Sequence, residues 1–283
     1  STAALRGITK QYKDFTLGPV DMTVPAGSIV GLIGENGAGK TTLLKILCGV
    51  NRADDGTVDL LGGSPADAAT RAKIGVVFED AFFYGSFTAA QVARSLAGMY
   101  GARWNADSFS AHLRRFGLDA GKKLKEYSRG MRLKLSLAAA LAHDPELLVL
   151  DEATAGLDPV VRGELLDLFL EFIQDERHSI VMSSHITADL EQIADSIAYL
   201  HNGQLLFQEN KDDLLQEYGV LHCGEDVLPS LPAGLVVFTR RGAYGCESLV
   251  RERRTVQELL PEAVCDAARL DDIMRFYSGR DAQ

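Results

Sequence analysis

Along the first 215 or so residues of this 283-residue chain, short apolar runs alternate with amphipathic stretches. The apolar runs have the length of buried strands, and residues 40–49 have helical spacing. The pattern therefore predicts strands at 28–33, 57–61, 74–78, 146–153 and 178–185. Because strands and helices alternate, we expect an α/β fold in which helices cover a mainly parallel sheet.

The pattern changes between about residues 82 and 126, where the strand signals fade. Residues 88–100 and 107–118 have the spacing of amphipathic helices, which indicates a helical insertion inside the α/β domain. Elsewhere, residues 15–34 have the pattern of short strands broken by Gly and Pro, and Asn202-Gly203 is the centre of a predicted β-hairpin.

A second change near residue 220 predicts a small α/β appendage, with a strand at 235–239 and a closing helix at 270–277. We therefore expect a main domain at residues 1–219, with a helical subdomain at about 82–142, and an accessory region at 220–283.

The composition narrows the functional classes. The net charge of −10 argues against a broad electrostatic footprint for nucleic acid. No apolar run approaches the roughly 20 residues that span a bilayer, and the first ten residues lack the apolar core of a signal peptide, so we expect a cytosolic chain. The four cysteines show no CxxC spacing, which favours reduced, packed thiols over disulfides or a zinc site.

Residues 34–41, Gly-Glu-Asn-Gly-Ala-Gly-Lys-Thr, match the pattern G-x4-G-K-[ST] between a predicted strand and a predicted helix. In this pattern glycines let backbone N–H groups approach phosphate oxygens, the lysine adds charge at the β/γ position, and the threonine hydroxyl can ligate Mg²⁺. The sequence therefore predicts a nucleoside triphosphate site formed by Gly34, Glu35, Asn36, Gly37, Ala38, Gly39, Lys40, Thr41 and Thr42.

Two further strands end in polar residues suited to that site. Asp151 and Glu152 end one apolar strand, so that Asp151 can reach the Mg²⁺ shell and Glu152 can polarise an attacking water. His185 ends the strand at 180–184. A lone histidine there is usually structural, but strand ends in such sheets face the crevice beside the phosphate loop. A neutral His185 could therefore hydrogen-bond the γ-phosphate or the water.

The stretch KEYSRGMRLKL, residues 125–135, predicts a second anion-binding element. Ser128 can cap a helix, and Gly130 leaves its first turn bare, with N–H groups facing outward. One chain thus carries two phosphate-binding elements and only one nucleotide pocket.

The ordered series YSRGM and LLVLDEATAGLDP resembles the signature, Walker B and D-loop motifs of ATP-binding-cassette (ABC) transporter ATPase subunits, and the resemblance covers roughly residues 3–215. It implies a P-loop NTPase fold with a RecA-like, mainly parallel sheet, an antiparallel β subdomain, the helical insertion and the small C-terminal α/β appendage. It also implies ATP and Mg²⁺ as cofactors.

The resemblance further implies residue roles. Tyr12 would stack on adenine, Asp151 would order the metal, Glu152 would be the general base, and His185 would be the switch histidine. Two such cassettes pack head to tail in the family. Ser128 and Gly130 would therefore touch the γ-phosphate held by a second chain, expected to be an identical one, and Asp158 would lie in the D-loop between them.

Four positions depart from the family pattern. Arg129 occupies a glycine position of the signature, where it either adds charge or faces solvent. Glu79 replaces the glutamine of the Q-loop, so it can still meet Mg²⁺ or water but cannot donate a hydrogen bond. Ala153 replaces a common proline, and Gly156 stands where another small residue is frequent.

The resemblance is greatest to bacterial ABC-2-type exporter ATPases, which power separate membrane permeases from the cytoplasmic face of the membrane. A polytopic permease is thus the expected partner, gripped by the helical insertion, and no nucleic acid is expected. Two alternatives are soluble ABC ATPases, in nucleic-acid maintenance or in iron–sulfur cluster assembly. The acidic chain lacks a long insertion between the Walker motifs, which disfavours the first alternative. It also lacks metal-ligand spacing, which does not favour the second alternative but leaves it open.

Overall fold

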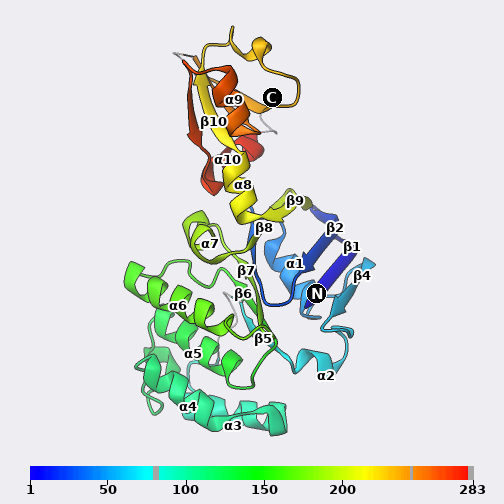
Figure 1. Cartoon of the computed structure of the whole chain (residues 1–283). Helices are drawn as coiled ribbons and strands as arrows, with labels where there is room; N and C mark the ends of the chain where they lie inside the picture. Colours follow the sequence, from blue (N-terminus) through cyan, green and yellow to red (C-terminus); the bar gives the residue numbers. More distant parts are fainter. Residues whose placement is uncertain (79–82, 243–244, 280–283) are drawn as a thin grey trace.

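The computed structural model describes residues 1–78, 83–242 and 245–279. Figure 1 shows a large body and a smaller unit above it, joined through α8 (Lys211–Glu217). The smaller unit is formed by the last sixty or so residues, drawn in yellow to red.

A six-stranded sheet forms the centre of the body, in the order β5-β6-β7-β3-β8-β9. Its strands are β3 (Ile29–Ile33), β5 (Ile74–Val77), β6 (Leu147–Asp151), β7 (Ser179–Ser183), β8 (Ser196–His201) and β9 (Gln204–Asn210). All neighbours pair in parallel except β8 and β9, which form the antiparallel hairpin predicted at Asn202-Gly203. Every residue of β3, β6 and β7 is buried, as expected where both faces of a parallel sheet are covered.

Different elements cover the two faces of this sheet. Alternate strand residues on one face pack against α1 (Lys40–Leu47) and the N-terminal sheet. The other face packs against α5 (Arg129–Leu141), α6 (Pro159–Phe172) and α7 (Thr187–Ile193). The period-two alternation of the strands therefore sends one set of side chains to each face.

The N-terminal sheet is antiparallel, with β1 (Ala3–Gln11) between β2 (Thr16–Val24) and β4 (Asp55–Leu60). The break expected at Gly18-Pro19 is absent, because β2 is one nine-residue strand that continues through both residues. β2 is an edge strand of its sheet, where a proline removes no necessary ladder hydrogen bond. The chain does leave the strand after Val24, at the predicted Pro25-Ala26-Gly27 break.

The helical insertion has its own apolar core. The insertion follows the short α2 (Ala68–Arg71) and β5 in the chain. It comprises α3 (Ala89–Tyr100), the single turn η1 (Gly101–Arg103), α4 (Ala106–Arg115) and the single turn η2 (Leu124–Glu126), and it continues into α5. Thr88 and Gln91 form a capping box at the start of α3, and side chains of α3, α4 and α5 make one buried cluster.

The C-terminal unit is a four-stranded antiparallel sheet with two helices. Its order is β11 (Val236–Gly242), β12 (Gly245–Val250), β10 (Gly219–Cys223) and β13 (Val264–Ala267), with η3 (Leu228–Ser230), α9 (Arg253–Leu259) and α10 (Leu270–Ser278). The Tyr277 ring on α10 lies 5.7 Å from Tyr199 of β8 and 5.6 Å from Phe207 of β9, so aromatic contacts join this unit to the central sheet.

Within the residues that the structure describes, no helix has both the length and the apolar character that a bilayer span requires.

Candidate nucleotide-binding site

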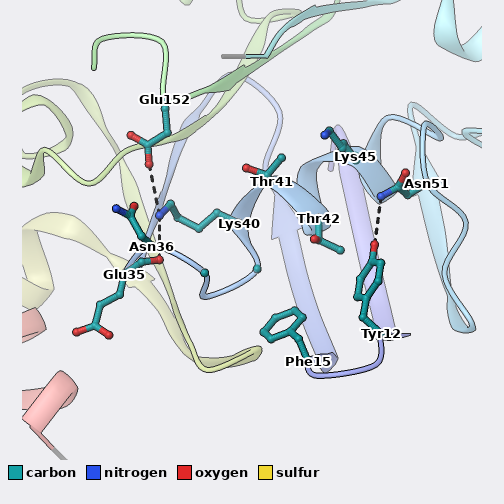
Figure 2. A pocket seen from close by; sticks show the side chains of 12 residues that line it. Tyr12, Phe15, Glu35, Asn36, Lys40, Thr41, Thr42, Lys45, Asn51 and Glu152 are labelled. Carbon is teal, nitrogen blue, oxygen red and sulfur yellow. Dashed lines mark hydrogen bonds and ion pairs between the residues drawn. The ribbon is translucent and has the colours of Figure 1, made fainter. Parts of the chain in front are cut away.

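A cavity of about 510 Å³ lies where β3 leads into α1 and β6 ends (Figure 2). The residues that line it are Tyr12, Phe15, Glu35, Asn36, Gly37, Gly39, Lys40, Thr41, Thr42, Lys45, Asn51 and Glu152. Seven of the nine residues predicted from the glycine-rich motif are thus brought to one cavity, while Ala38 is buried behind the loop. Gly34 is not among the lining residues either.

Two glycines let the loop turn tightly between β3 and α1. A Cβ on Gly34 would lie 2.2 Å from the carbonyl oxygen of Leu200, closer than any side chain tolerates. Gly39 has a φ of +107°, and a Cβ there would lie 2.9 Å from the Phe15 ring. No acidic residue lies in the first turn of α1, so its positive dipole end is available to an anion.

Lys40 is the first residue of α1 and is buried. Its ammonium group is held by oxygen atoms. Its Nζ donates to the carbonyl oxygens of Gly34, at 2.7 Å, and Glu35, at 3.2 Å. The same Nζ lies 3.4 Å from Oε1 of Glu152, an ion pair that Figure 2 shows across the cavity. The lysine is therefore fixed by the loop, with one carboxylate as its counter-ion.

Asp151 links the phosphate loop to two strands of the sheet. Its Oδ2 accepts a hydrogen bond from the Thr41 hydroxyl at 2.8 Å, and its Oδ1 accepts one from the Ser183 hydroxyl at 2.6 Å. Ser183 lies directly opposite Asp151 in the parallel register of β6 and β7. Ser183, which holds the carboxylate beside Thr41, was not predicted from the sequence.

Glu152 turns out of the sheet toward the cavity. Its backbone is left-handed, with a φ of +51°, and such strain at a non-glycine residue is typical of functional sites. Oε2 lies 2.6 Å from Nδ1 of His185 and accepts the His185 backbone N–H at 3.3 Å. Its two oxygens thus face Lys40 and His185, while the side chain is only 11% exposed.

These groups can bind a polyphosphate. Thr41 and Asp151 offer the hard oxygen donors that Mg²⁺ prefers. Among the described residues no cluster of three or more His, Cys, Asp or Glu could hold a metal. Mg²⁺ is usually bound by one or two carboxylates together with substrate phosphates.

Known proteins share this arrangement. The profile of the ABC transporter family matches residues 17–155. An uncharacterized ABC transporter ATP-binding protein of Synechocystis sp. is 38% identical over 206 residues, which span 71% of this chain and 58% of that protein. The bacitracin transport ATP-binding protein BcrA of Enterococcus faecalis is 36% identical over 212 residues, which span 73% of this chain and 68% of BcrA. The chain belongs to the ATP-binding proteins of ABC transporters.

The fold is also similar to the ATP-binding cassette MJ0796, solved as a dimer in a post-hydrolysis state bound to ADP and Pi. The match has a TM-score of 0.67 and covers 74% of this chain and 98% of that one, at 23% identity, so it carries the fold alone. Together the comparisons confirm the recognised family, the P-loop α/β fold and the assignment as an ABC-type ATPase that binds ATP. ABC ATPases dimerise and partner with membrane permeases.

In this cassette the wall opposite the Glu152 end of the cavity is aromatic. Tyr12 follows β1 and is 46% exposed, and its hydroxyl accepts a 3.4 Å hydrogen bond from Asn51. Figure 2 shows Tyr12 and Phe15 on the same side of the phosphate loop, away from Glu152. The predicted Tyr12 thus lines the cavity, whereas Phe15, Lys45 and Asn51 were not predicted, because no motif marks them.

The signature residues lie elsewhere. Ser128 is the N-cap of α5, where its Oγ accepts the Met131 N–H at 3.2 Å, and neither Ser128 nor Gly130 lines the cavity. Asp158 is likewise outside the cavity and caps α6 through hydrogen bonds from the N–H groups of Val160 and Val161. Glu79, the Q-loop residue, lies outside the described residues.

Two departures from the family pattern meet in one contact. Gly156 has a φ of +69°, and a Cβ built on it would lie 3.1 Å from Nη1 of Arg129. Arg129 is exposed, but its guanidinium packs against the D-loop of its own chain, which neither expectation for this residue included. A Cβ on Gly130 would lie 3.6 Å from Leu157, so the signature helix and the D-loop touch at two points.

Cys48, at the end of α1, is the thiol nearest this chemistry. Burial, and secondarily the negative charge of Asp151, raise the pKa of Cys48 to about 12. The thiol therefore stays protonated and acts as a packed apolar side chain.

Proposed function

We propose that this chain hydrolyses ATP as one of two cassettes that power a separate polytopic membrane permease, as an exporter. The observation that carries the proposal is the set of contacts from Lys40 to Glu152 and from Glu152 to His185, beside the Thr41–Asp151 pair. Phosphoryl transfer to water requires a lysine, a carboxylate that can bind the metal ion, and a second carboxylate that can orient the water. Here an imidazole holds the second carboxylate.

In the mechanism, Mg²⁺ would be held by Thr41 and Asp151 and would neutralise phosphate charge. Lys40 exchanges its Glu152 counter-ion for β- and γ-phosphate oxygens, which frees one carboxylate oxygen of Glu152. That oxygen accepts the proton of the attacking water, while His185 holds the other oxygen and fixes the orientation of the base. Tyr12 stacks on the adenine ring. We also propose that Glu79 contacts the metal or a water beside it.

The site needs a second chain to be complete. Ser128 and Gly130 lie at the solvent-accessible start of α5, outside the cavity of their own chain, so we propose that they bind the γ-phosphate held by a partner cassette, most simply an identical copy. Asp158, next to that helix through the Leu157 contact, would lie in the same interface. ATP then joins two cassettes, and its hydrolysis separates them.

The export direction and the membrane location rest on relatives. BcrA is a bacitracin transport protein, and other relatives transport lantibiotics. We therefore propose that residues 1–219 form the ATPase domain, that its helical subdomain at about 82–142 grips the permease at the cytoplasmic face of the membrane, and that residues 220–283 form an accessory region.

Purification from detergent-solubilised membranes tests this function. We expect a polytopic protein to copurify with the cassette and to increase its ATPase rate when the two are mixed after separate purification. Copurification of nucleic acid or of soluble iron–sulfur scaffold proteins, with no membrane protein, would favour the soluble ABC ATPases instead.

Dilution of the purified cassette is the second test. If each site needs two chains, the ATPase rate per chain must fall as dimers dissociate on dilution. A rate per chain that stays constant at concentrations where no dimer is detected by light scattering would contradict the two-chain site.

A further inference from the structure

Two cysteines of the accessory region face each other across neighbouring strands. Cys223 on β10 and Cys246 on β12 are directly paired in the antiparallel register, and their Sγ atoms lie 3.8 Å apart. Residues directly opposite in antiparallel strands have Cα atoms about 4.5–5.5 Å apart. A disulfide needs about 4.4–6.8 Å, so the backbone already has the required spacing.

The pair contrasts with the other two cysteines. Cys246 Sγ also donates to the carbonyl oxygen of Cys223 at 3.2 Å, which holds the second sulfur beside the first residue. Cys48 and Cys265 are buried, and no second sulfur is found beside either among the described residues. The chain thus contains one adjacent pair and two isolated thiols, which act as internal controls.

A small molecule can reach the pair from solvent. Both cysteines line an open cavity of about 620 Å³, together with Arg240, Arg241 and Glu247. Cys223 is partly exposed, whereas Cys246 is only 4% exposed. Cys223 is the more exposed of the two sulfurs, so an incoming small disulfide meets it first.

We propose that Cys223 and Cys246 form a reversible disulfide that is made by thiol–disulfide exchange with a small disulfide such as glutathione disulfide. The Cys223 thiolate attacks one sulfur of the oxidant and releases one glutathione thiolate, leaving a mixed disulfide on Cys223. The Cys246 thiolate then attacks Cys223 Sγ and releases the second glutathione. Two protein thiols are oxidised, two glutathione thiols are formed, and the two protons pass to water or to the released thiolates.

The surroundings of the pair set its rate. Burial, together with the neighbouring Cys246, raises the pKa of the Cys223 thiol to about 11, and the Asp226 carboxylate adds to this rise. Because the thiolate is the nucleophile, exchange is slow at neutral pH and accelerates as the pH rises toward that value. His222, Glu247, Arg240 and Arg241 also line the cavity beside the sulfurs.

The disulfide would join β10 to β12, whose cysteines are separated by 22 intervening residues that include η3 and all of β11. The disulfide therefore reduces the conformational freedom of this segment in the unfolded chain. It does not change the nucleotide cavity. Nothing in this inference depends on the proposed transport function.

The test uses the full chain incubated with glutathione disulfide at pH 8.5 and then denatured and alkylated. We expect the number of reactive thiols to fall from four to two and the intact mass to fall by about 2 Da, with a peptide map that links Cys223 to Cys246 and reversal by dithiothreitol. A Cys48→Ser, Cys265→Ser double variant must behave identically, because it keeps the pair.

Three outcomes would overturn the proposal: four thiols that persist, a link that involves Cys48 or Cys265, or a glutathione adduct on Cys223 that never closes onto Cys246. A Cys246→Ser variant supplies the matched control. It should stop at the mixed disulfide, with a mass gain of one glutathionyl group on Cys223.

Discussion

The phosphate loop and the signature helix both present a helix start to an anion, but they are built differently. The start of α1 has no side-chain cap. The same chain places the charged side chains Lys40 and Glu152 beside it. The start of α5 is capped by Ser128, is exposed to solvent and lies outside the cavity. One helix start is thus completed by its own chain, whereas we propose that the other is completed by a ligand bound to a partner cassette.

This difference predicts that turnover, unlike binding, depends on two chains. A site whose groups all come from one fold binds its ligand at any dilution. A site whose groups are divided between two surfaces works only when the surfaces meet. Binding should therefore depend on the first helix and turnover on both, and variants of each should separate the two properties.

The largest effect is expected for Glu152→Gln. The amide keeps the shape of the side chain but cannot accept the proton of the attacking water, so turnover should fall by about 10²–10⁴-fold. ATP binding should remain and an ATP-bound dimer should accumulate, measured by phosphate release and by size-exclusion chromatography. Undiminished turnover would reject Glu152 as the base.

Ser128→Arg should stop turnover without affecting nucleotide binding to the monomer. The bulky cation obstructs the α5 helix start, and loss of a positioned donor to the γ-phosphate typically costs about 10²-fold in rate. Fluorescent-nucleotide titration of the dilute protein and steady-state phosphate release provide the two measurements. Weakened binding to the monomer would contradict the division between chains.

A mixing experiment sharpens this prediction. Lys40→Ala disables the phosphate loop, and in a mixed dimer with Ser128→Arg both defects fall on one site while the other site is intact. Since about half of randomly formed dimers are mixed, independent sites would restore about a quarter of wild-type turnover from two inactive variants. A single-chain site would give no recovery at any mixing ratio.

A smaller effect is expected for Tyr12→Ala at the adenine end. Stacking of a base on an aromatic ring is worth about 1–3 kcal/mol, and since Tyr12 is half exposed we expect the low end, about fivefold weaker binding. Tyr12→Phe is the control, because it keeps the ring and loses only the long hydrogen bond from Asn51. Equal Kd values for the two variants would argue against stacking.

The smallest effect concerns the contact between the signature helix and the D-loop. Gly156→Ala should lower the free energy of unfolding by about 1 kcal/mol because Gly156 has a positive φ. The loss should be larger still because the new methyl group would press against the Arg129 guanidinium. In an Arg129→Ala background the loss should shrink by about 0.5 kcal/mol. Gly117→Ala isolates the backbone cost, since Gly117 has a φ of +65° and nothing near its Cβ position. Additive losses in urea denaturation would exclude the coupling.

The parts of the site that the sequence predicts are those held in contiguous residues. The glycines and the lysine of residues 34–41 act within one turn of chain, so their spacing is enough to predict the cavity. The apolar strand before Asp151 likewise predicts where that carboxylate lies. The helical insertion and the Asn202-Gly203 hairpin were predictable for the same reason, since each depends on local periodicity or local turn chemistry.

The rest depends on contacts between distant segments. Ser183 meets Asp151 only through the register of β6 and β7, and Asn51 meets Tyr12 only because α1 ends beside the turn after β1. The left-handed backbone of Glu152, which turns its carboxylate toward Lys40, has no sequence signal. Pro19 gave the wrong signal, because an edge strand tolerates a residue that usually ends strands.

The pairing of Lys40 with Glu152 also predicts a preference among anions. A monovalent anion such as chloride gains little by displacing a carboxylate that His185 also holds, so we expect it to compete poorly for the lysine. A polyphosphate brings several negative charges and its own metal, and it outcompetes the resident carboxylate. In the proposed mechanism, the arrival of the substrate thus frees the Glu152 carboxylate to act as the base.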